Sequence, residues 1–403
     1  MKKIGFISLL LSYIMVATMC TKHQNTENKF TESMDSLFNS HYNNDAPGYA
    51  IAIVKDDSLI YQSAKGIADL DKRDVIDGNT VFNIASITKQ FTVVGILKLQ
   101  EQGLLNIDDN ISKYFPEFKG EIWKNVKIRH LMSQSSGVPD NRPRTDKNFM
   151  LYIVDKQCLE YMVDLNELKF EPGSNYDYKN PTFQVLAEII TRVSGMPFEE
   201  FQKKNLFDSA GMTNVRYFAP SLEIPQMAHG YINVSKKDNS MVDSDSQKSR
   251  DNVEGQYQDE NGYMWMEYDY GEETFFGTKA DGGIYTSVND FIKWEKALRD
   301  NVILKKETLD LAYTNQITVT GSKYSSYQNR DYTYYGFGWF IDETPNRDRK
   351  IYHTGDNGGF QAYASKYPDS NLNIVMLSNR NDMNRWELQM KIESILLENG
   401  YIK

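Results

Sequence analysis

The chain has 403 residues, of which 40% are hydrophobic and 25% are charged, and its formal net charge is −10. This length is sufficient for one large enzyme of mixed helix and sheet or for two coupled lobes. The acidity argues against a nucleic acid as partner, because binding to phosphates requires a basic surface.

Residues 1–20 are predicted to be an export signal. Lys2 and Lys3 form a basic start, an apolar stretch covers residues 4–19, and the chain turns polar at residue 21. The apolar stretch is too short and too often interrupted for a membrane-spanning helix, so cleavage is the better interpretation.

Cys20 lies where a bacterial lipoprotein carries its acylated cysteine, although Met19 is bulky where a lipobox has a small residue. We therefore predict an exported protein with a lipid anchor in the bacterial cell envelope; a plain secretory signal and an uncleaved anchor are the alternatives. The other cysteine, Cys158, would then have no disulfide partner. The five histidines are scattered along the chain, so neither a metal site nor a cofactor is predicted.

Residues 21–44 are predicted to form a tether and a first helix, because apolar residues recur at helical spacing over 30–38. Two β-rich runs over 49–54 and 59–66 predict a hairpin. A helix is expected over 86–102, where the apolar positions again follow a helical period.

Two further helices are predicted over 151–165 and 181–194. Residues 235–273 are polar, acidic and without apolar periodicity, which favours an insertion loop. This loop is either a solvated excursion or a lid beside the active site. The C-terminal part returns to short aromatic or β-branched runs and one amphipathic helix. Strands are predicted over 335–341, 350–352, 360–367 and 372–378, and the helix over 383–397.

The order of the predicted elements indicates the fold class. Strands lie at both ends of the sequence and helices lie between them. This order predicts an α/β (α+β) domain over residues 45–400. One antiparallel sheet, built from both chain ends, would be flanked by helices and would carry an inserted, mostly helical lobe.

The first chemical signal is Ser86-Ile87-Thr88-Lys89. A serine hydroxyl is a weak nucleophile at neutral pH and needs a base beside it. At the start of a helix, residues three apart share one face, so the Lys89 amine can reach the Ser86 oxygen. The helix N-terminus favours both a developing oxyanion and a neutral lysine. The alternative is a surface lysine on an ordinary helix, because this spacing also arises by chance.

The stretch 82–89, Phe-Asn-Ile-Ala-Ser-Ile-Thr-Lys, resembles the nucleophile motif of the serine β-lactamase and penicillin-binding-protein family. Within that family it is similar to the branch of class C β-lactamases, D-amino-acid-releasing peptidases and related esterases. Residues 128–137 resemble the helix and loop on the rim of the family's cleft, and residues 170–173 resemble its turn. The resemblance runs from about residue 45 to residue 378.

The resemblance also gives roles to Tyr178 and Asn180, which follow that turn. Tyr178-Lys179-Asn180 is similar to the Tyr-x-Asn motif of the family. The resemblance implies that Tyr178 shuttles the proton between Ser86, the lysine and the leaving group. It also implies that Asn180 holds the amide of the substrate or the lysine. A phenol becomes a useful base when a nearby ammonium stabilises its phenolate.

His353-Thr354-Gly355 resembles the Lys-Thr-Gly edge strand of the family. The resemblance implies that Gly355 allows a close approach of the substrate and that the N–H of Asp356 completes an oxyanion hole with that of Ser86. His353 stands where β-lactamases carry a lysine that binds a carboxylate. Because histidine is mostly neutral at pH 7, β-lactamase activity is less expected than esterase or peptidase activity.

These motifs predict an exported serine hydrolase that forms an acyl-enzyme with a small ester, amide or peptide-like substrate. A cell-wall D,D-carboxypeptidase, a D-aminopeptidase and a β-lactamase are alternatives. A non-catalytic binding or sensor protein on the same fold is another, although such homologues usually lack a catalytic residue. Contact with a membrane is expected only through the lipid anchor at Cys20.

Overall fold

The computed structural model of this chain describes residues 28–143, 147–217, 224–235, 256–269, 277–321 and 332–403. The predicted export signal and Cys20 lie outside the described residues. Among the helices that the structure describes, none has the length and apolar character needed to span a bilayer.

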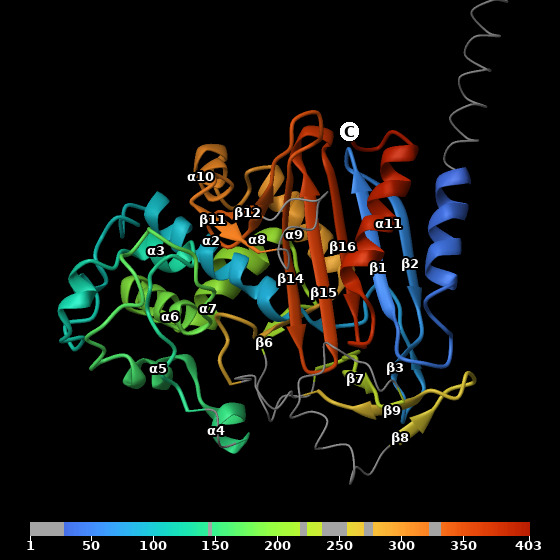
Figure 1. Cartoon of the computed structure of the whole chain (residues 1–403), viewed down its shortest axis with the longest axis horizontal. Coiled ribbons are helices and arrows are strands. Elements are labelled where there is room, and N and C mark those ends of the chain that lie inside the picture. The colour runs from blue at the N-terminus through green and yellow to red at the C-terminus, as the bar shows by residue number, and fades with distance from the viewer. Residues whose placement is uncertain (1–27, 144–146, 218–223, 236–255, 270–276, 322–331) are drawn as a thin grey trace, which may run out of the picture.

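An eight-stranded antiparallel sheet is the centre of the fold (Figure 1). Its strand order is β11-β12-β13-β14-β15-β16-β1-β2. The first strand of the chain therefore lies beside the last, and Tyr49 pairs with Ser378. This pairing confirms the prediction of one sheet built from both chain ends. The strands are β1 (Tyr49–Lys55), β2 (Ser58–Lys65), β11 (Ile317–Thr320), β12 (Tyr332–Tyr335), β13 (Phe340–Asp342), β14 (Lys350–Asn357), β15 (Phe360–Tyr367) and β16 (Leu372–Ser378).

Side-chain alternation along β1 decides what covers each face of the sheet. Its large residues face helix 28–39 and α11 (Arg385–Glu398), whereas Ala50 and Ala52 face the opposite side, where α9 (Val288–Arg299) packs. Figure 1 shows helix 28–39 beside β2 at the right of the sheet. The cluster on that outer face includes Phe30, Met34, Phe38, Tyr49, Ile51, Ile53, Leu388, Ile392 and Leu396.

The helical lobe lies on the other side of the strands, at the left of Figure 1. Helix α2 (Thr88–Glu101) is buried on nearly all sides, which places it inside the core between sheet and lobe. Helix α6 (Pro181–Ser194) begins with Pro181 and ends at Gly195 in the left-handed conformation, as its sequence predicts. The other helices are α3 (Ile128–Met132), α4 (Lys147–Tyr152), α5 (Asp155–Cys158), α7 (Phe198–Gln202), α8 (Asp208–Ala210) and α10 (Lys306–Ala312).

Two predicted elements are wrong in their continuity. The helix over 151–165 is broken, because Val154 is extended and the side chain of Gln157 accepts its N–H, which starts a new helix. The strand over 335–341 is two strands, β12 and β13, joined by a turn. Gly338 in this turn has a φ of +82°, a left-handed conformation that a strand residue does not adopt.

The predicted insertion loop over 235–273 contains more structure than expected. Strand β9 (Met264–Glu267) pairs with both β7 (Tyr231–Asn233) and β8 (Gln256–Gln258) in a small antiparallel sheet. Burial of Trp265 and Met266 stabilises this sheet, and the runs are too short for a sequence pattern to show. Residues 236–255 and 270–276 lie outside the described residues.

Candidate active site

Ser86 lies in the 3₁₀ turn Ala85–Ile87, between strand β5 (Phe82–Asn83) and helix α2. Strand β5 is held by β10 (Ile284–Thr286), which also pairs with β6 (Arg216–Tyr217). Ala85 has a φ of +45°, a conformation that costs about 1–2 kcal/mol for a residue other than glycine. The side chain of Asn83 accepts the Ala85 N–H at 2.8 Å and supports this sharp turn. The strained turn presents Ser86 at the start of the helix.

Lys89 lies one helical turn after Ser86, as its spacing predicts. Its Nζ is 3.0 Å from Ser86 Oγ and donates to the Asp281 carbonyl at 2.8 Å. The side chain is fully buried. Burial lowers the pKa of Lys89 from 10.5 to about 8; the charge of Arg142 also lowers it, and that of Asp281 opposes the shift. The neutral amine, which can accept a proton, is therefore accessible close to neutral pH.

Tyr178 reaches the same place from the helical lobe, and Asn180 follows it by two residues. The Tyr178 ring centroid is 4.9 Å from Lys89 Nζ and 6.2 Å from the centroid of the His353 ring. Asn180 directly precedes α6. Its Oδ1 is buried and has no hydrogen-bond partner in the part of the chain that the structure describes. The structure thus brings Ser86, Lys89 and Tyr178 together.

His353 is buried on β14 within a group of aromatic rings. Its Nδ1 lies 2.7 Å from the Thr354 carbonyl, which only an N–H can satisfy, so Nε2 accepts from the Tyr335 hydroxyl at 3.3 Å. Burial, together with the nearby charge of Lys89, lowers the pKa of His353 to about 3. The imidazole is therefore neutral and offers no positive charge to a substrate.

Gly355 lies where β14 packs against the 3₁₀ turn that contains Ser86. Strand β13 pairs with β14 only up to Tyr352, so the following residues continue past the end of β13. A Cβ on Gly355 would lie 2.2 Å from the Ile84 carbonyl oxygen, so only glycine fits. Arg385 on α11 fixes this end of the strand. It binds the Asp356 carboxylate at 2.8 and 2.9 Å and donates to the Gly355 carbonyl at 3.0 Å.

The arrangement of these motifs agrees with the comparison with known families. The beta-lactamase family model matches residues 26–392. The chain belongs to the beta-lactamase family.

Penicillin-binding protein 4* from Bacillus subtilis is 26% identical over 335 residues, which are 82% of this chain. A solved penicillin-binding protein from Bacillus halodurans is similar with a TM-score of 0.67 at 25% identity, over 86% of this chain and 95% of that one. The D-amino acid amidase from Ochrobactrum anthropi has the same fold, with a TM-score of 0.69 at 19% identity, over 93% of this chain and 99% of that one. The chain spans 60% to 67% of the length of the curated relatives it matches.

A group of buried and half-buried charges near Lys89 was not predicted from the sequence. Arg142 binds Asp140 through two hydrogen bonds of 2.8 and 2.9 Å. The Asp155 carboxylate accepts the N–H groups of residues 279 and 280, at 2.8 and 3.2 Å, and so holds the segment that presents the Asp281 carbonyl to Lys89. These residues lie far apart in the sequence, so no local pattern joins them.

Replacing Gly355 by alanine should damage both this beta-lactamase-family site and the stability. Because the new Cβ meets backbone, β14 must move away from the Ser86 turn. We expect roughly a 10²-fold loss of kcat/KM, since small displacements of catalytic groups are costly, and a loss of about 1–3 kcal/mol in unfolding free energy. Steady-state kinetics and denaturant unfolding measure both. Gly282→Ala is the matched control, because its Cβ would meet nothing closer than 3.8 Å; equal effects of the two variants would contradict the steric argument.

Asp155 should make the stability of the protein depend on pH. Burial, reinforced by the charge of Asp281, raises the pKa of Asp155 from 3.8 to about 7. Between these pH values the folded chain retains a proton that the unfolded chain has lost, so the unfolding free energy falls as pH rises through this window. Asp155→Asn should remove this fall, and its unfolding free energy relative to wild type should increase from pH 5 to pH 8 in denaturant titrations. The exposed Asp164→Asn should show no such change; a constant difference for Asp155→Asn would contradict the prediction.

Proposed function

We propose that this protein is a serine hydrolase that cleaves amide or ester bonds of peptide-like substrates through an acyl-enzyme. The proposal depends on one observation above all, the 3.0 Å contact between Ser86 Oγ and the buried Nζ of Lys89. Burial keeps the pKa of this lysine at about 8, so the residue can act as a base. A lysine with only a structural role would not require a serine hydroxyl within 3.0 Å of its Nζ.

In the proposed reaction, Ser86 Oγ attacks the substrate carbonyl carbon and its proton passes to Lys89 or through Tyr178. The backbone N–H groups of Ser86 and Asp356 stabilise the oxyanion. The carbon–nitrogen or carbon–oxygen bond then breaks, and the leaving group takes the proton. Water attacks the acyl-enzyme with Tyr178 or Lys89 as base, which releases the acid and restores Ser86.

Two features favour an uncharged amide or ester over a β-lactam. The neutral His353 replaces the lysine that would bind a substrate carboxylate. The buried Oδ1 of Asn180 is an acceptor that a substrate N–H would satisfy. The similarity in fold to a D-amino acid amidase is compatible with such a substrate. We therefore place amides and esters of amino acids or short peptides before D-Ala-D-Ala peptides, and both before β-lactams.

A substrate panel tests this order. The purified protein is incubated with D- and L-amino acid amides, short-chain aryl esters, peptides ending in D-Ala-D-Ala, and a chromogenic cephalosporin. Intact-mass spectrometry follows the acyl adduct. We expect turnover of amides or esters, with an adduct whose mass equals the acyl group. If no substrate is turned over and no adduct forms, the protein is a binding or sensor homologue and the proposal is wrong.

We also propose that the chain is exported and anchored by a lipid at Cys20, as the N-terminal sequence predicts. Expression of the whole chain in a bacterium, followed by cell fractionation, tests this. The wild-type protein should be found with the membranes and Cys20→Ser in the soluble fraction. Membrane association of both proteins would indicate an uncleaved anchor, and release of both would indicate a plain secretory signal.

A further inference from the structure

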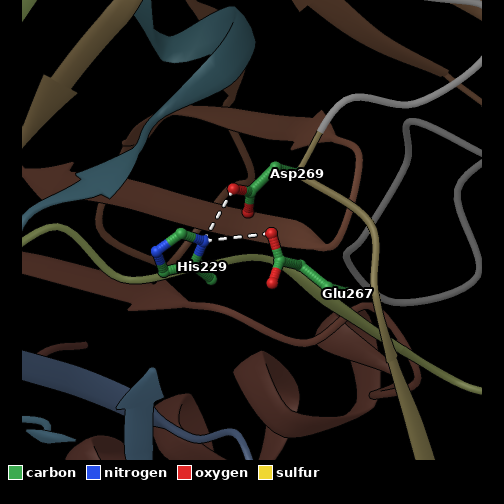
Figure 2. Close-up of side chains that lie close together, drawn as sticks. All are labelled: His229, Glu267 and Asp269. Carbon is green, nitrogen blue, oxygen red and sulfur yellow. Dashed lines mark hydrogen bonds and ion pairs between the residues drawn. The ribbon is translucent and has the colours of Figure 1, made fainter. Parts of the chain in front are cut away.

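A second cluster of polar side chains lies outside the candidate active site. Figure 2 shows the side chains of His229, Glu267 and Asp269 converging on one point. His229 Nδ1 lies 2.9 Å from Asp269 Oδ2 and 3.2 Å from Glu267 Oε1, and all three atoms lie within 4.8 Å of one another. Four ligands at about 2.0–2.1 Å around a tetrahedral zinc ion are separated by about 3.3 Å. The separations of 2.9 and 3.2 Å are close to this value.

The local backbone explains why these side chains meet. In the antiparallel pair of β7 and β9, Tyr231 lies opposite Glu267. The Tyr268 N–H donates to the Gly230 carbonyl at 2.7 Å, so the ladder continues past the end of both strands. This register places His229 opposite Asp269, on the same face as Glu267, two residues away. The Gly230 N–H also donates to Asp269 and orients its carboxylate.

The charges around His229 also suit a cation. Asp69 Oδ2 lies 3.7 Å from His229 Nε2, on the side of the ring away from Glu267 and Asp269. A carboxylate in this position is typical of metal-binding histidines, whose second nitrogen faces an outer acid. Once a bound ion has displaced the imidazole proton, three carboxylates face one ammonium, that of Lys72, which lies 3.0 Å from Asp69. These four groups together carry a net charge of −2, which one divalent ion would neutralise.

The cluster is both anchored and accessible. Asp69 and Asp269 are buried, whereas the Glu267 side chain is 48% exposed and that of His229 is 27% exposed. An ion can therefore enter from solvent and keep a water as its fourth ligand. Residues 268 and 269 also pack against the turn at Gly358 that joins β14 to β15.

We propose that His229, Glu267 and Asp269 bind one divalent transition-metal ion, with zinc the best match to one imidazole and two carboxylates. The ion links the segment before residues 236–255, which carries His229, to the segment after them, which carries Glu267 and Asp269. It lies close to the C-terminal end of β14. The sequence did not predict this site, because His229 is 38 residues from Glu267 and 40 residues from Asp269. The proposal is independent of the proposed hydrolase activity.

Zinc binding to the whole, untagged chain tests the proposal. After treatment with a chelator, the protein is titrated with zinc alone by calorimetry, and cobalt is added to a second sample for absorption spectroscopy. We expect one equivalent of zinc to bind with micromolar or tighter affinity and to raise the melting temperature. The cobalt spectrum should show tetrahedral nitrogen and oxygen ligation.

Variants localise the ion. Glu267→Gln, at a half-exposed position, and His229→Ala should each weaken zinc binding at least tenfold and change the cobalt spectrum. Asp69→Asn should weaken it roughly 10-fold, as loss of an outer carboxylate does. Glu307→Gln, an exposed glutamate on α10, is the control. Absence of stoichiometric zinc binding, or unchanged affinity in Glu267→Gln and His229→Ala, overturns the proposal and leaves the cluster as an ion-paired imidazolium.

Discussion

Replacing Ser86 by alanine is expected to abolish turnover and covalent labelling while the fold remains intact. The hydroxyl lies 3.0 Å from Lys89 Nζ at the start of α2, and the proposed acyl-enzyme forms on this oxygen. We expect kcat/KM to fall roughly 10⁴-fold or more, as removal of a nucleophile does in other serine hydrolases. A fluorophosphonate probe should phosphonylate the wild type, which gains the mass of the probe less HF, and should leave the variant unchanged.

Stability must be measured in parallel, since an unfolded variant would also fail to react. Ser86 is only partly buried, and the substitution removes one oxygen, so we expect the melting temperature to change by a few degrees at most. Ser394→Ala, an exposed serine on α11, should label like the wild type. Equal labelling of Ser86→Ala and wild type would show that the nucleophile lies elsewhere.

Replacing Lys89 by methionine is expected to have the second largest effect. Methionine retains the volume of the buried chain and removes the amine that takes the proton from Ser86. We expect a fall in kcat/KM of roughly 10²–10⁴-fold, the range of general-base contributions. In the wild type, kcat/KM should rise with pH to a plateau above about pH 8, because the pKa of Lys89 is about 8 and the neutral amine is the active form.

The lowered pKa of Lys89 also predicts an effect of pH on stability. The pKa of Lys89 is 10.5 when unperturbed and about 8 in the folded chain. Between these values the unfolded chain binds more protons, so the unfolding free energy of the wild type rises with pH. Lys89→Met should lack this contribution in denaturant titrations from pH 7.5 to 10. Lys98→Met is the control. Lys98 lies on the same helix, but its amine donates to the Ile303 carbonyl and not to Ser86. A pH–rate profile or stability profile unchanged in Lys89→Met would contradict the assignment.

The features of this protein that could be predicted from its sequence are local. Ser86 and Lys89 are three residues apart at the start of an apolar helix, and helical geometry places them on one face whatever the rest of the chain does. Period-two and helical patterns likewise predicted β1, β2, β15, β16 and α6 within a few residues. With strands at both ends, these patterns also indicated the single antiparallel sheet.

Which distant residues surround that helix start depends on how the sheet and the lobe pack together. Tyr178 and His353 were expected there by family resemblance, but the contacts of Tyr178 with Lys89 and with His353 depend on the packing of the lobe against β14. The support of Asp281 by Asp155 and the meeting of His229 with Glu267 had no marker in the sequence. Such contacts depend on strand register and burial, which join residues far apart in the chain, whereas sequence periodicity reports only the geometry within one element.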